Sequence, residues 1–203
     1  MLLLVRRSTL WRSSLGLAGF VCLLCGGVAG QQIRVTFDPG QTRIAWTLGA
    51  TMHSVHGTFR LRSGSVKLDP RSGEASGEIV VDATSGDSGN HDRDADMHNK
   101  VLESARYPDI IFLPKRVTGS LAGQGKSDLQ VQGAFKIHGA EHDVTLLTAI
   151  EKSGDTITAV TSMVVPYQDW GMKNPSKMFL HVDSKVEVSI SAIGHVTVDA
   201  PQR

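Results

Sequence analysis

Hydrophobic and polar residues alternate one by one along most of the chain after residue 30. In residues 129–137, for example, Leu129, Val131, Phe135 and Ile137 are separated by polar or small residues. The same period of two recurs at residues 44–48, 79–83, 144–150, 157–165 and 186–192. Successive side chains of a β-strand point to opposite faces, so this pattern predicts antiparallel strands with one apolar and one solvated face.

Short turn sequences separate these predicted strands. Gly, Pro, Asp and Ser cluster at residues 38–40, 69–73 and 153–155, and a Gly follows a His at 138–139. Many short strands joined by tight turns are typical of a β-sandwich or an up-and-down β-barrel. Because each strand has one apolar side, the sheet must either curl over that side or meet a second sheet.

One segment breaks the alternation. Met97, Val101 and Leu102 recur at helical spacing, and acidic residues precede them at the start of the segment: Asp92, Asp94 and Asp96. Acidic groups near a helix N-terminus are stabilised by the helix dipole. Tyr107 then precedes a proline, a position that disfavours helical backbone. We therefore predict one short helix near residues 93–105.

The first 30 residues have the composition of a secretory signal peptide. Three arginines precede an apolar run at residues 15–25, and small residues follow at 26–30. We expect cleavage near Gly30–Gln31, which leaves one domain, residues 31–203, with no stable membrane anchor and a periplasmic or secreted location. An uncleaved membrane anchor is the alternative, but the apolar run is shorter than a membrane span requires.

Charge and cysteine content narrow the function classes. The chain has 21 Lys and Arg against 20 Asp and Glu, a formal net charge of +1, without the basic excess typical of nucleic-acid-binding proteins. Both cysteines, Cys22 and Cys25, lie in the expected signal peptide. The mature domain would therefore have neither a disulfide nor a thiol nucleophile.

Two groups of residues are candidates for metal binding. Asp92, Asp94, Asp96 and Glu103 have the one, three, five and twelve spacing of a calcium loop, but Met97 occupies the sixth position, where such a loop needs glycine. His53 and His56, and likewise His138 and His142, are spaced as on a helix but lie in strand or turn sequence. We therefore expect no metal site.

Motifs of common enzyme classes are absent from the sequence. It contains no G-x-S-x-G, H-E-x-x-H, phosphate-binding loop or G-x-G-x-x-G motif. We therefore predict a protein that is not an enzyme, with no catalytic residue and no cofactor.

Four blocks of the sequence resemble motifs of a known family and follow one another in the same order as those motifs. Residues 90–112 contain an Arg-Asp pair that opens a helix, then Tyr-Pro and a strand ending in Phe; the other blocks are residues 56–59, 132–139 and 166–171. Together they are similar to the YceI-like family of secreted, lipocalin-like barrels described as polyisoprenoid-binding. The resemblance covers about residues 33–195. Two family features differ: Asp96-Met97 and Val101-Leu102 replace the usual His-Leu and Phe residues, and the spacing from Arg-Asp to Tyr-Pro is one residue shorter.

The resemblance implies an all-β, antiparallel, lipocalin-like barrel of about eight strands. It also implies non-catalytic binding or transport of an isoprenoid or quinone-like lipid in the barrel interior, outside the cytoplasm. Arg93 and Asp94 would stand at the barrel mouth. The strand and helix patterns select the residues expected to line the cavity: Trp46, Phe59, Val81, Met97, Leu102, Phe112, Val131, Phe135, Ile137, Leu146, Met163 and Val188. Two alternatives remain, a small-molecule enzyme and a stress-associated interaction protein that uses the barrel as a scaffold.

Overall fold

The computed structural model describes residues 32–51, 53–176 and 181–199. The expected signal peptide and its cleavage site lie outside the described residues. Nine strands and two short helical segments follow one another along the described chain: β1 (Gln32–Phe37), β2 (Arg43–Ala50), β3 (Val55–Leu68), β4 (Ala75–Asp87), α1 (His91–Asp96), η1 (Met97–Val101), β5 (Asp109–Thr118), β6 (Gly125–Ile137), β7 (Ala140–Ser153), β8 (Thr156–Val165) and β9 (Val182–Asp199).

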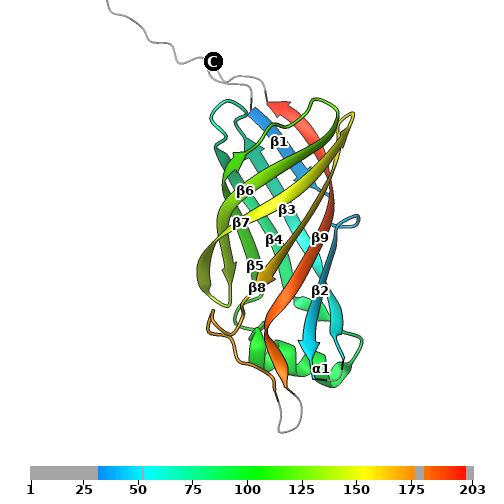
Figure 1. Ribbon diagram of the computed structural model, residues 1–203, viewed down its shortest axis with the longest axis vertical. Helices are drawn as coiled ribbons and strands as arrows, with labels where there is room; N and C mark the ends of the chain where they lie inside the picture. The colour runs from blue at the N-terminus through cyan, green and yellow to red at the C-terminus, as the bar shows by residue number, and fades with distance from the viewer. Residues whose placement is uncertain (1–31, 52, 177–180, 200–203) are drawn as a thin grey trace, which may run out of the picture.

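The strands form a closed antiparallel barrel, as predicted. Each strand from β4 to β9 pairs with the next, β9 pairs with β2, and β2 pairs with β3. Pairing of β3 with β4 closes the circuit, which therefore has eight positions. Figure 1 shows an elongated barrel with α1 at one end and β1 at the other. Of the two architectures that alternation permits, the chain adopts the one in which the sheet curls over its own apolar face.

The ninth strand does not widen the barrel, because β1 and β2 share one position. Both lie between β3 and β9. Near the helical end, β2 pairs with the first part of β3, from Val55 to Phe59. Near the other end, β1 pairs with the last part of β3, from Ser65 to Leu68. The long strands β3 and β9 thus span the whole barrel, and the turn after β1 divides the space between them.

The helical segment is shifted from its predicted position of residues 93–105. It begins with α1 at His91, continues as one π-helical stretch, η1, and ends at Val101. Asn90 precedes it with an extended backbone, and its side chain accepts a hydrogen bond from the Arg93 backbone N–H at 3.0 Å. The helix therefore starts earlier than the acidic residues alone suggested, because an asparagine supplies the cap.

Two hydrophobic clusters fill different halves of the barrel. One lies at the end where β1 pairs with β9; its buried members are Leu129, Ile150, Ile157, Ala159 and Val196, and β1 packs against it with Ile33, Val35 and Phe37. The other lies toward the helical end, and its buried members are Ala83, Leu102, Ile110, Ile137, Val165, Tyr167 and Met172. No helix in the described part of the chain is long and apolar enough to cross a membrane.

Candidate binding cavity

A cavity of about 440 Å³ occupies the helical half of the barrel. Strands β2, β3, β4, β5, β6, β8 and β9 contribute to its wall, and the helical segment contributes Met97, Val101 and Leu102. Most of the lining side chains are aliphatic or aromatic. The volume is within the usual range for small-molecule sites, which are concave and mostly apolar.

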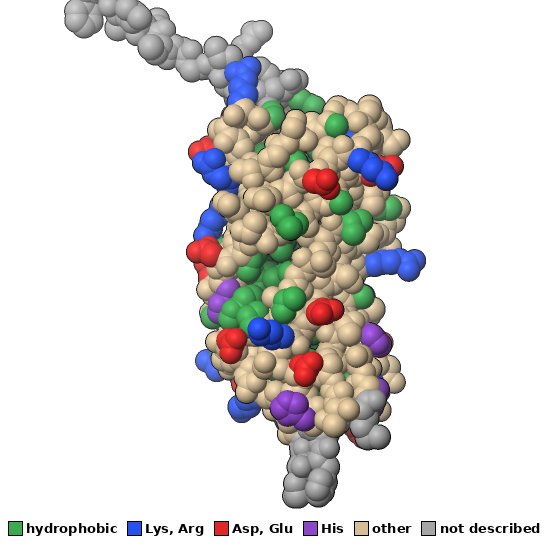
Figure 2. Space-filling model, viewed as in Figure 1, with side chains coloured by type: hydrophobic (Ala, Val, Ile, Leu, Met, Phe, Trp, Pro, Cys, Tyr) green, Lys and Arg blue, Asp and Glu red, His purple; other side chains and the backbone are tan. Residues whose placement is uncertain are grey.

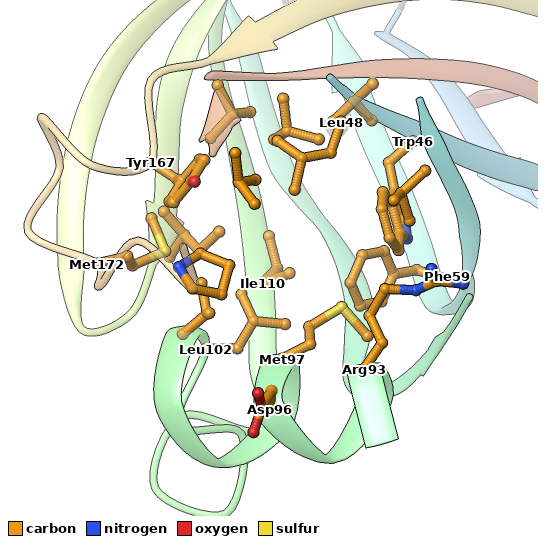
Figure 3. A pocket seen from close by; sticks show the side chains of 18 of the residues that line it. Trp46, Leu48, Phe59, Arg93, Asp96, Met97, Leu102, Ile110, Tyr167 and Met172 are labelled. Atoms are coloured by element: carbon orange, nitrogen blue, oxygen red, sulfur yellow. The ribbon is translucent and has the colours of Figure 1, made fainter. Parts of the chain in front are cut away.

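Many residues that the sequence marked for the cavity meet in its wall. They are Trp46, Phe59, Val81, Met97, Leu102, Phe135, Ile137, Met163 and Val188. Figure 3 shows Trp46 and Phe59 on one side of the space, Tyr167 and Met172 on the opposite side, and Met97 and Leu102 next to the helix. Residues far apart in the sequence converge here because neighbouring strands place their inward positions at the same level: Trp46 pairs with Val188, which pairs with Met163.

Three residues predicted to line the cavity do not do so: Phe112, Val131 and Leu146. Val131 pairs with Leu146 and with Val117, and Val117 packs against the cluster at the filled end of the barrel. Phe112 is buried, and its ring lies so close to Gly133 that a Cβ there would be 2.7 Å from two ring atoms. The expectation was wrong for these residues because period-two alternation identifies the face of a strand, whereas the cavity extends along only part of the barrel.

The charged side chains of the cavity lining belong to the helical end. Its lining includes Asn90, Asp92, Arg93 and Asp96 from the helical segment and the residue before it, and His53 from the turn after β2. Lys100 donates a hydrogen bond to Asp96 at 2.6 Å, so the charge of that carboxylate is balanced on the helix itself. The cavity therefore has a polar mouth beside the helix and an apolar interior.

Arg93 and Asp94 are both half-buried and both bind Ser88. Arg93 donates from Nε to the Ser88 hydroxyl oxygen and from Nη2 to the Ser88 carbonyl. The Asp94 carboxylate accepts hydrogen bonds from the backbone N–H and the hydroxyl of Ser88. Only Arg93 also lines the cavity. Asp94 lies on the helix at this end of the barrel, and its carboxylate is turned to the chain that enters the helix and not to the cavity.

Tyr167 and Met172 line the cavity but were not among the predicted residues. Both are buried and belong to the segment between β8 and β9. The Tyr167 hydroxyl donates to the Asp183 carbonyl at 2.6 Å, and burial, reinforced by the Asp183 carboxylate, raises the pKa of Tyr167 to about 12. The phenol thus stays protonated and keeps this donor at neutral pH. The family-like block at residues 166–171 contains Tyr167 and was the one sequence signal that pointed to this segment.

The histidines and acids considered for metal binding have other roles. Asp92, Asp94 and Asp96 lie on α1, so they do not form a calcium loop. His56 makes a hydrogen bond with Thr47, and the ring of His142 stacks on Trp170. Within the described ranges, no three His, Cys, Asp or Glu side chains are grouped so as to hold a metal ion.

The sequence of this barrel matches a family model over most of its length. The model of the YceI-like domain matches residues 35–193. The chain belongs to the YceI-like family. A search of curated protein sequences finds no match.

Solved structures share the YceI-like fold at low sequence identity. BcnA of Burkholderia cenocepacia is 19% identical, with a TM-score of 0.63 over 77% of this chain and 98% of that one. A polyisoprenoid-binding domain from Saccharophagus degradans, described as implicated in plant cell wall breakdown, is 15% identical, with a TM-score of 0.62 over 80% and 98%. A YceI protein of Campylobacter jejuni is 18% identical, with a TM-score of 0.55 over 74% and 88%. At these identities the likeness concerns the fold.

Proposed function

We propose that this YceI-like protein binds an isoprenoid-type lipid in the helical half of its barrel, without catalysis and outside the cytoplasm. The observation that carries the proposal is the mostly apolar cavity of about 440 Å³, whose charged lining residues belong to the helical segment. The Saccharophagus relative is described as polyisoprenoid-binding, which supports the same ligand class here. The composition of residues 1–30 supports export.

The distribution of polar groups suggests how the lipid would lie. Its polar end would stay near Arg93 and Asn90 at the mouth, and its chain would extend between Trp46 and Tyr167 toward Met163. Each chain methylene that leaves water contributes about 0.8 kcal/mol. Affinity would therefore rise with chain length until the cavity is full.

The two alternative functions differ from this proposal in what the cavity would contain. A scaffold protein would not need an open interior, and an enzyme would need titratable groups that converge on a substrate. Here the charged and imidazole side chains of the lining, those of His53, Asp92, Arg93 and Asp96, lie at the mouth, and Tyr167 is held by the Asp183 carbonyl. This arrangement favours binding.

Native mass spectrometry of the protein purified from its own host, without delipidation, tests the proposal. We expect a bound apolar molecule that is released by organic solvent and has the fragment pattern of an isoprenoid. A protein that carries no lipid, and that also takes up none when incubated with prenyl alcohols, would contradict the proposed function.

A further inference from the structure

The barrel wall is incomplete between β7 and β8. Within the described residues, the ladder between these strands runs from Ser153 and Thr156 to Thr148 and Thr161 and goes no further. Beyond it, residues 140–147 of β7 pair with β6 alone, and residues 162–165 of β8 pair with β9 alone. The Thr161 hydroxyl donates to the Leu147 carbonyl at 2.8 Å where the two strands separate. We call this part of the wall the β7–β8 interval.

The β7–β8 interval adjoins the cavity. Met163 and Val165 line the cavity, and both belong to the part of β8 that does not pair with β7. Phe135 of β6 also lines the cavity, and its strand partner on β7 is His142. Figure 2 shows hydrophobic side chains gathered on this face of the barrel, where β7 and β8 diverge in Figure 1. Leu147 and Val164, both more than half exposed, border the interval on its outer side.

Residues 166–176, which follow β8, cover the interval and are attached on one side of it. Their hydrogen bonds within the described chain go to one another, to β8 or to β9: Tyr167 binds Asp183, Gln168 binds Ser184, and Asn174 binds Val182. Across the interval, the buried Tyr167 and Met172 pack in the same cluster as Ile137 of β6, and the Trp170 ring reaches both β6 and β7. That ring stacks on His142 with centroids 4.0 Å apart and planes 4° apart, and it lies 5.9 Å from the Phe135 ring.

The helical end of the cavity is fastened by directional hydrogen bonds. Arg93 and Asp94 bind Ser88, and His98 binds the Gly86 carbonyl at 2.9 Å, so the helix is tied to β4 and its continuation by hydrogen bonds. The contacts described across the β7–β8 interval are ring stacking and apolar packing instead. Such contacts are not directional, so the interval can open without breaking a hydrogen bond across it within the described residues.

We infer that the lipid enters and leaves through the β7–β8 interval, and that Trp170 is the latch that holds it closed. This inference rests on the proposed function. Moving the Trp170 ring away from His142 of β7, while Tyr167 stays bound to the Asp183 carbonyl, opens the space sideways. A chain passing there moves between apolar side chains on both strands, without crossing the polar mouth.

Stopped-flow kinetics with a dansyl-labelled prenyl alcohol tests the latch. Trp170→Ala removes the ring stack without removing a hydrogen bond of the side chain. We expect both the association and the dissociation rate constants to rise roughly two- to tenfold, while their ratio changes less than either. Trp170→Phe keeps a stacking ring and should lie between the parent and Trp170→Ala, and it replaces Trp170→Ala in the comparison if that variant does not fold. Thermal unfolding checks the fold of each variant.

His98→Ala is the control for the opposite end, because it loosens the helix from β4 without changing a residue of the cavity wall. We expect it to leave both rate constants within twofold of the parent. If His98→Ala accelerates exchange and the Trp170 variants do not, passage occurs at the helix and the inference is wrong. If the parent binds the labelled prenyl alcohol but all variants exchange it at the parental rate, the inferred role of Trp170 is wrong, whereas the proposed function stands. If the parent binds none, the proposed function fails, and the latch with it.

Discussion

Arg93 holds Ser88 through two hydrogen bonds, from Nε to the hydroxyl oxygen at 2.8 Å and from Nη2 to the carbonyl oxygen at 2.9 Å. Asp94 completes the arrangement, because its carboxylate accepts from the Ser88 N–H at 2.9 Å and from the Ser88 hydroxyl at 2.5 Å. Adjacent residues of opposite charge thus bind the donors and the acceptors of a single serine. This contact fixes α1 to the end of β4 and so positions the polar mouth of the cavity.

Asp94→Ala is expected to lower the free energy of unfolding by about 1–2 kcal/mol, since it leaves the half-buried Ser88 N–H without its charged acceptor. Asp92→Ala is the matched control: Asp92 is also an acid in the first turn of α1, but its side chain is fully exposed. It should change stability by no more than about 0.5 kcal/mol. Urea unfolding of both variants measures the difference, and equal midpoints would show that the Ser88 contact does not stabilise the fold.

Gly57 permits a close approach between β3 and the Trp46 ring. A Cβ at this position would lie 2.3 Å and 2.4 Å from two atoms of the indole and 2.5 Å from the Asp87 carbonyl oxygen. Gly57→Ala should therefore destabilise the protein by about 1–3 kcal/mol, the usual cost of overpacking. It should also shift the Trp46 side chain into the cavity and weaken lipid binding.

Gly123→Ala provides the comparison, because a Cβ there meets nothing within 4 Å. Its stability should be unchanged or slightly higher, since alanine restricts the unfolded chain. Thermal denaturation of the two variants measures this difference. A Gly57→Ala protein with the melting temperature of the parent would contradict the described packing of Trp46 against Gly57.

The raised pKa of Tyr167 leads us to expect a loss of folding stability at high pH. Its pKa is raised to about 12 in the folded protein, against about 10 in an unfolded chain. Because the pKa is higher in the folded state, the stabilisation from this group is complete below pH 10. It is lost progressively as the pH rises from 10 to 12.

Tyr167→Phe removes this titration together with the hydrogen bond to Asp183. At neutral pH the variant should be less stable than the parent by about 1–2 kcal/mol. Between pH 10 and 12 the gap should narrow, because the Tyr167 phenol ionises in the unfolded parent while burial keeps it protonated in the folded parent, and the variant has no such group. Denaturant unfolding at pH 8, 10 and 11 measures the gap, and a gap that stays constant would contradict the burial of this hydroxyl.

The strands could be predicted from the sequence because nearly every one of them shows its own alternation of apolar and polar residues. Alternation marked the inward face of β2 from Ile44 to Leu48, and the turn between β6 and β7 forms at His138 and Gly139, where both residues have positive φ. One apolar face per strand permits either a closed barrel or two packed sheets, and the resemblance to the YceI-like family favoured the barrel. Sharing of one barrel position by β1 and β2 was not predictable in this way, since it depends on the lengths of β3 and β9 relative to their partners.

The extent of the cavity along the barrel was harder to predict than the face of each strand that turns inward. Phe112 and Phe135 are strand partners, yet only Phe135 lines the cavity, because the Phe112 ring lies against Gly133, where there is no side chain to keep it away. Tyr167 was missed for a different reason. It belongs to an irregular segment, where no periodicity shows which side chains turn inward.

A titration of the protein with dansyl-labelled prenyl alcohols tests the central claim most directly when it compares Val188→Trp with Ser189→Trp. Val188 lines the cavity beside its strand partners Trp46 and Met163, whereas its neighbour Ser189 is exposed on the outer face of the same strand. A bulky ring at 188 fills the space for the chain, and the same ring at 189 points to solvent. We expect saturable binding to the parent and to Ser189→Trp, and binding at least about tenfold weaker for Val188→Trp, the loss that follows from displacing about two methylenes. Equal affinity of all three proteins, or no binding to the parent, would contradict a lipid site inside the barrel.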